Sequence, residues 1–129
     1  MPTVNSAIFG DSNFMNLKAV TEGEIRQEVY ALLVSREEIV CAYKTIRDQV
    51  IFTNRRILVA NVQGLVGKKV GYFSYPYSKV QFYGVQTAGL LDIDSELMLS
   101  FSNGALLTFD FKAKVDIRKL CAIISEYIL

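Results

Sequence analysis

The chain has 129 residues, enough for one domain with a single hydrophobic core that needs no disulfide or metal to fold. Its net charge of +1 gives no overall field to attract nucleic acid, so any basic site must be local. Histidine is absent, which removes the commonest general base and metal ligand and every Ser-His or Cys-His nucleophile arrangement.

Residues 1–37 are expected to form an N-terminal helical segment. The stretch from Thr21 to Glu24 has the Thr-x-x-Glu spacing of a capping box, and apolar residues follow at helical intervals from Ile25 onward. This pattern predicts a helix over 22–34. Upstream, the apolar residues of 4–18 are spaced for a short or broken helix.

From residue 38 the apolar period changes to two, and β-branched and aromatic residues occur in short runs between turn formers. In 91–102, Leu and Ile alternate with Asp and Glu, as in a strand with one buried and one solvated face. Asn103-Gly104 then predicts a tight hairpin turn. We expect seven strands, over 38–45, 48–53, 56–62, 69–75, 79–87, 91–102 and 105–111.

The last segment, 115–129, returns to helical spacing with an apolar stripe that must lie on an apolar surface. Consecutive strands followed by one amphipathic helix indicate an α+β, mostly β, domain. We expect an antiparallel barrel or two packed sheets over 38–129, capped by the C-terminal helix, and a single compact domain with the segment 1–37.

Three motifs that could carry chemistry are incomplete. The Gly64–Lys69 stretch resembles a phosphate loop, but Val62 stands where the first Gly is required. Residues 92–96 begin like a calcium loop, but Leu97 replaces its Gly. Cys41 and Cys121 lack CxxC spacing and are expected to be reduced core thiols. We therefore predict no catalytic residue, no metal site and no cofactor.

Two groups of basic residues are candidate binding sites. In a meander of the first four strands, successive turns alternate between the two ends of the sheet. Lys44 and Arg47 would then share one end with Lys68 and Lys69, where they could hold a phosphate or carboxylate, and Arg55 and Arg56 would lie at the other. The alternative is a solvated charge cluster, which is the norm for charges at loops.

The strings AYKTIRDQVIFTNRRILV, QGLVGKKVGYFSYPYSKV and TAGLLDIDSELML resemble the bacterial pleckstrin-homology family, formerly a domain of unknown function, over residues 20–129. The resemblance implies a PH-like seven-stranded barrel capped by the last helix, no known catalytic activity and a tendency to form ring-like homo-oligomers. Eukaryotic relatives bind phosphoinositides through a basic motif that runs from the first turn into the second strand. This chain departs from that motif, because no basic residue follows Arg47 before Arg55.

These observations predict a non-enzymatic cytoplasmic interaction module that self-assembles and presents a surface to an unknown protein or peptide partner. The mean hydropathy of +0.26 agrees with apolar surface covered by another subunit. One alternative is an anionic-lipid or phosphate binder that uses Lys44, Arg47, Lys68 and Lys69. Another is a peptide binder at a sheet edge or groove. No apolar run approaches the roughly 20 residues of a membrane span, and nucleic acid is not an expected partner.

Overall fold

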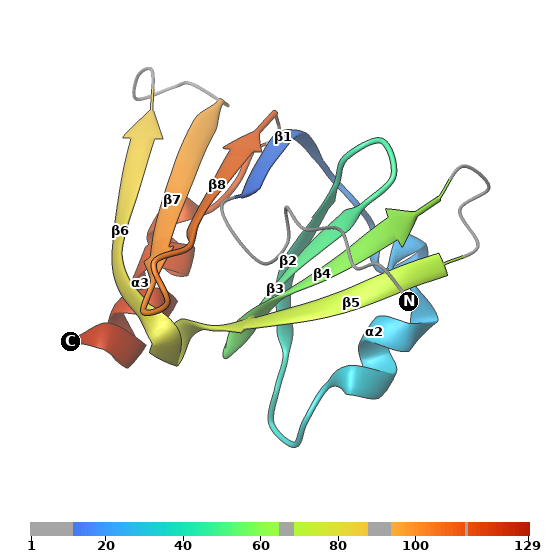
Figure 1. The fold of residues 1–129 in the computed structure, drawn as a ribbon, viewed down its shortest axis with the longest axis horizontal. Coiled ribbons are helices and arrows are strands. Elements are labelled where there is room, and N and C mark those ends of the chain that lie inside the picture. The colour runs from blue at the N-terminus through green and yellow to red at the C-terminus, as the bar shows by residue number, and fades with distance from the viewer. Residues whose placement is uncertain (1–11, 65–68, 88–93, 113) are drawn as a thin grey trace.

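A computed structural model describes residues 12–64, 69–87, 94–112 and 114–129. Within these residues, eight strands form one curled sheet in the order β5-β4-β3-β2-β1-β8-β7-β6, and Figure 1 shows its two halves facing each other as a half-barrel. The strands are β1 (Ser12–Ala19), β2 (Ile39–Lys44), β3 (Gln49–Thr53), β4 (Arg56–Gln63), β5 (Lys69–Pro76), β6 (Val80–Thr87), β7 (Ser95–Phe101) and β8 (Leu106–Phe111). The helices are α2 (Gln27–Leu32), α3 (Ile117–Ile128) and the short 3-10 helices η1 (Glu22–Glu24) and η2 (Tyr77–Lys79).

The main core fills the inside of the half-barrel with aromatic rings. Phe14 of β1 stacks on Phe109 of β8 at a centroid distance of 5.1 Å, and Phe52 of β3 meets Phe109 edge-on at 5.3 Å. Helix α3 adds Leu120 and Ile124 to this core, as its apolar stripe predicts. The core therefore joins both halves of the sheet to the C-terminal helix.

A second, smaller core lies on the outer face of the β2–β4 half. There Ile25 and Val29, from the segment around α2, pack on Ile51 and Leu58. Strands β3 and β4 are consequently buried on both faces, which explains why their sequences read as nearly continuous apolar runs. Helix α2 is placed against this outer face in Figure 1.

The predicted mostly β class with a closing helix is confirmed, and each of the seven expected strands has a counterpart in the described residues. The expected helix over 22–34 is broken into η1 and α2, because Ile25 is extended and the Arg26 N–H bonds the Gln49 side chain of β3 at 3.1 Å. Part of the predicted strand 91–102, residues 91–93, lies outside the described residues.

The prediction of a short or broken helix before residue 18 is wrong for the described part, because Ser12–Ala19 forms strand β1. This strand runs parallel to β8 and antiparallel to β2, and so it is the eighth strand that links the two halves of the sheet. A register shift lies between Phe14 and Leu17, with Asn16 at φ 55°. The extra residue of such a bulge lets two residues three apart both face the core, which is the spacing that had indicated a helix.

Candidate functional site

The predicted basic cluster lies at the β2–β3 turn. Arg47 donates a hydrogen bond from Nη2 to the carbonyl oxygen of Gly64, and Asp48 accepts the N–H of Val62 at 3.0 Å. These bonds hold the first turn against the end of β4, so Arg47 shares one end of the sheet with Lys69, the exposed first residue of β5. Lys68 lies outside the described residues.

Lys44 of this cluster already has a partner. Its Nζ lies 3.0 Å from Oε2 of Glu24 in η1, and both side chains are almost half exposed. The hydrogen bond from Lys44, with those from Thr21, lowers the pKa of Glu24. The contact holds the η1–α2 segment close to the β2–β3 turn. Because the Glu24 carboxylate offsets the charge of the Lys44 ammonium, Lys44 attracts an anionic ligand less strongly.

An open hollow of about 1220 Å³ lies beside this turn, between β1 and the end of β8. Lys18 of β1 and Lys112 after β8 line it together with Lys44 and Arg47. Lys112 also pairs with Asp94 at 3.4 Å and with Asp110 at 3.8 Å. Sequence reasoning missed Lys18 and Lys112 because only the pairing of β1 between β2 and β8 brings them to this end.

Two apolar side chains stand at the rim of the same hollow. Ile46, at the tip of the β2–β3 turn, is fully exposed, and Met15 of β1 is more than half exposed. An exposed apolar residue between Lys44 and Arg47 makes the turn amphipathic. A turn of this kind is suited to contact a surface that has an anionic outer layer and an apolar interior.

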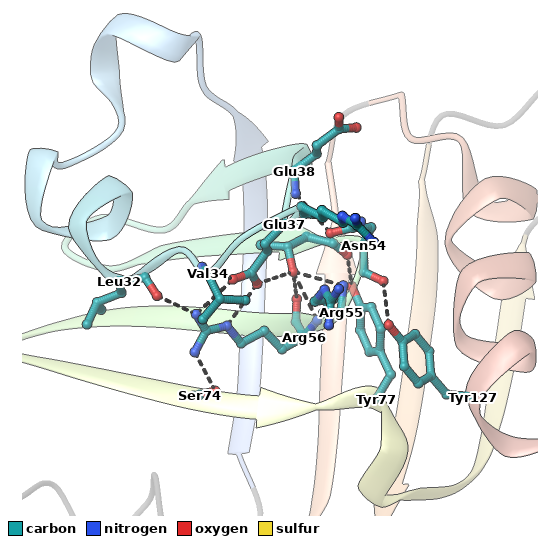
Figure 2. A network of polar contacts seen from close by, with 12 residues as sticks. Leu32, Val34, Glu37, Glu38, Asn54, Arg55, Arg56, Ser74, Tyr77 and Tyr127 are labelled. Atoms are coloured by element: carbon teal, nitrogen blue, oxygen red, sulfur yellow. Dashed lines mark hydrogen bonds and ion pairs between the residues drawn. The ribbon is translucent and has the colours of Figure 1, made fainter.

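The second predicted basic end is built differently, because Arg56 is part of a buried ion pair. Its Nε and Nη2 each lie 2.8 Å from one carboxylate oxygen of Glu37, and its Nη2 also donates to the Leu32 carbonyl at 2.6 Å. Figure 2 shows Arg56 reaching between Leu32, Glu37 and Ser74. Arg55 beside it is exposed. Of this pair, Arg55 alone keeps its side chain available to a ligand.

Glu37 is the residue around which this network is organised. Its side chain has no exposed surface, whereas that of Arg56 is 19 % exposed. Burial acts to raise the pKa of Glu37, but hydrogen bonds from Arg56, from Thr53 Oγ1 at 2.7 Å and from the Val34 N–H outweigh it, and the pKa is lowered. The carboxylate is therefore ionised at neutral pH, and it ties the α2–β2 connection to the β3–β4 turn.

A groove of about 390 Å³ lies between the C-terminal half of β5 and the β7–β8 turn. Its walls are aromatic: Phe73 and Tyr75 come from β5, and Phe101 comes from β7, with 5.6 Å between the ring centroids of Tyr75 and Phe101. Burial raises the pKa of Tyr75 to about 12, so its hydroxyl stays neutral. Phe101 is almost fully buried, whereas Phe73 and Tyr75 are partly buried and pack against the main core.

The end strand β6 exposes apolar side chains. Phe82 is 56 % exposed and Val85 is 37 % exposed. The strand reads VQFYGVQT, without a charged residue or a proline. Alternation alone could not reveal this surface, because which strand lies at the edge depends on the order of strands in the sheet.

The described residues offer little to catalysis. Among them, no group of three or more Cys, Asp or Glu side chains is placed to hold a metal ion. Cys41 and Cys121 are free and partly buried, and burial raises the pKa of Cys41 to about 11, far from a reactive thiolate. In the same ranges, no helix is both long and apolar enough to cross a bilayer.

Comparison with known proteins gives consistent matches. The family model described as "Bacterial PH domain" matches residues 8–128. The uncharacterized protein YjqA of Bacillus subtilis (strain 168) is 32 % identical over 108 residues, which are 84 % of this chain and 86 % of YjqA. A DUF1696 family protein with a pleckstrin-homology domain from Shewanella loihica has a TM-score of 0.70 at 34 % identity, covering 89 % of this chain and 99 % of that one. A pleckstrin homology domain from Shewanella amazonensis has a TM-score of 0.56 at 34 % identity, covering 96 % and 97 %.

Proposed function

The chain belongs to the bacterial PH domain family, and from that premise we propose that it is a non-enzymatic interaction module that self-assembles through the edge of strand β6. The observation that carries the proposal is that β6, the last strand of the sheet within the described residues, has no charged residue or proline and exposes Phe82 and Val85. The assembled copies then present their remaining surfaces to a partner protein.

An edge strand offers unpaired N–H and C=O groups, and proteins usually protect it with charged residues or proline. At the other end of the sheet, β5 carries Lys69 and Pro76, whereas β6 has neither kind of residue. Fully burying a side chain such as Phe or Val contributes about 1.5–3 kcal/mol. Phe82 is 56 % and Val85 is 37 % exposed, on opposite faces of β6, so covering their exposed parts by a second copy at this edge would contribute a fraction of that energy.

Light scattering over a range of concentrations tests this assembly. We expect a discrete multiple of 14.5 kDa for the unmodified chain. The variant Phe82→Lys should lower the mass, because an exposed position tolerates Lys in the fold while the charge disrupts the contact. Ile46→Lys is the matched control, since it removes an exposed apolar residue elsewhere and should keep the mass. A monomer up to millimolar concentration would contradict the proposal.

A second candidate function, favoured by the amphipathic β2–β3 turn, is binding to an anionic surface at the hollow. Ile46 would enter the apolar layer while Lys18, Lys44 and Arg47 face anionic groups. Vesicles of phosphatidylglycerol and phosphatidylcholine should bind the chain more tightly than phosphatidylcholine alone, and salt should weaken the binding. Binding that Ile46→Asp and Lys18→Ala leave unchanged would remove this candidate.

A further inference from the structure

We propose that Glu24 of η1 is an internal competitor for the anionic surface that the hollow binds. In the free chain its carboxylate occupies Lys44, one of the basic residues that line the hollow. An anionic surface then has to displace this carboxylate before it engages Lys44. The inference rests on the second candidate function, and it adds a contact within the chain that regulates binding at that site.

The capping box at the start of η1 fixes the position of the Glu24 carboxylate. Its Oε1 accepts hydrogen bonds from the N–H and from the hydroxyl of Thr21, each at 3.2 Å. Its Oε2 lies 3.0 Å from Nζ of Lys44. Because Thr21 holds one carboxylate oxygen, the other is held in place to receive the ammonium group. The carboxylate therefore takes the position on Lys44 that an anionic ligand would take.

Gln49 anchors η1 beside the same end of the sheet. It is the partner of Lys44 in the β2–β3 ladder. Its Nε2 donates to the Glu24 carbonyl at 2.8 Å, and its Oε1 accepts the Arg26 N–H at 3.1 Å. The main chain around Glu24 is thus tied to β3 by bonds that do not involve the carboxylate. A substitution that removes only the charge of Glu24 should leave η1 in place.

The pair of Glu24 and Lys44 is weak enough to exchange. Both side chains are almost half exposed, and exposed ion pairs contribute little to stability. A bilayer with anionic headgroups attracts several basic residues at once, and so it can replace a single carboxylate. Lys18 and Arg47 line the same hollow and would meet that surface together with Lys44. The internal pair consequently lowers the affinity for the bilayer without blocking binding.

The variant Glu24→Gln tests the competition, because Gln at this position keeps the capping box and removes the charge. Vesicles of phosphatidylglycerol and phosphatidylcholine are the probe. We expect the variant to bind them about threefold more tightly than the unmodified chain, as the small contribution of an exposed pair implies. Glu22→Gln is the matched control, since it removes the same charge from an exposed position of the same 3-10 helix. Its affinity should change less.

The substitution Lys44→Ala separates competition for Lys44 from general repulsion between an acidic residue and an anionic surface. In the Lys44→Ala background, Glu24→Gln should change the affinity no more than Glu22→Gln does, because no lysine is left to release. A gain that persists without Lys44 would overturn the proposal. So would equal gains from Glu24→Gln and Glu22→Gln, or no gain from Glu24→Gln when urea unfolding shows that the variant is folded.

The second candidate function can fail or survive independently of this test. If the unmodified chain binds the vesicles and Glu24→Gln binds them equally, the hollow keeps its candidate function and the competition is refuted. If neither chain binds at low salt, the candidate function fails and the competition fails with it. Binding by Glu24→Gln alone would support both and would show that the internal pair dominates.

Discussion

The buried pair of Glu37 and Arg56 makes the sharpest prediction about stability. The substitution Arg56→Met removes the guanidinium while keeping a long apolar stem, and it leaves the fully buried Glu37 carboxylate without its bidentate partner. Removing one member of a buried pair costs about 3–5 kcal/mol. Because 19 % of the Arg56 side chain reaches solvent, we expect the lower end of that range, about 3 kcal/mol.

Urea unfolding is the measurement. With a denaturant slope of about 1–3 kcal/mol per molar, the predicted loss lowers the midpoint by roughly 1–3 M urea. Lys44→Met is the control, because its pair with Glu24 is half exposed on both sides. Its urea midpoint should stay close to that of the unmodified chain, because exposed ion pairs contribute little to stability.

The pH dependence of the loss follows from the lowered pKa of Glu37. A carboxyl group whose folded pKa lies below its unfolded value of 4.5 contributes stability above pH 4.5 and loses it as the pH falls through the folded pKa. The difference in unfolding free energy between Arg56→Met and the unmodified chain should therefore be largest near pH 7 and shrink below pH 4.5. A loss under about 1 kcal/mol, or the same loss at pH 7 and at pH 3, would refute the reasoning.

Three further predictions each rest on a single feature and are checked by the same unfolding curves. Phe109→Ala, at the centre of the main core, should cost about 3–5 kcal/mol, and a smaller cost would mean that the neighbouring rings close the cavity. Gly104→Ala should cost about 1–2 kcal/mol because its φ is 90°, whereas Gly23→Ala, at an ordinary φ with open space, should be almost neutral; equal costs would exclude backbone strain as the cause. Asp116→Ala should cost about 1 kcal/mol, since its carboxylate accepts the Lys119 N–H at 3.1 Å, and an unchanged midpoint would show that this cap does not hold α3.

Strands whose burial alternates were predictable from the sequence. In Ser95–Phe101, every second residue is buried, and this is the period of two that the sequence shows. The apolar stripe of α3 was equally visible, because Leu120 and Ile124 lie one turn apart and both face the core. In both cases a local repeat reflects burial on one side of a regular element.

Strand β1 was not predictable in this way. Phe14 and Leu17 are three residues apart, which reads as one face of a helix, and the bulge near Asn16 is what turns both toward the core of a strand. The split of the 22–34 helix has a similar origin, since a side chain from Gln49 takes the Arg26 N–H. Contacts with distant parts of the chain overrode the local pattern in each case.

The candidate sites show the same division. The sequence predicts that Arg47 and Arg56 lie at opposite ends of the sheet formed by β2–β5, because successive turns of a meander alternate between the two ends of its strands. It could not reveal that Arg56 is committed to Glu37, 19 residues away, or that Lys18 and Lys112 line the hollow beside Arg47. Such pairings depend on register and chain path, which no local repeat records.

The sequence by itself determined the class of fold, the strand boundaries over most of 39–111, the closing helix and the family. These follow from short-range periodicity and from motifs that survive in order along the chain. The tertiary structure alone decided which strands are edges, which basic residues are neutralised and where aromatic rings stay half exposed. The physical reason is that an edge strand, an ion pair and a groove each depend on which segments of the chain lie side by side. The free energy of packing two segments together is not a property of either segment alone.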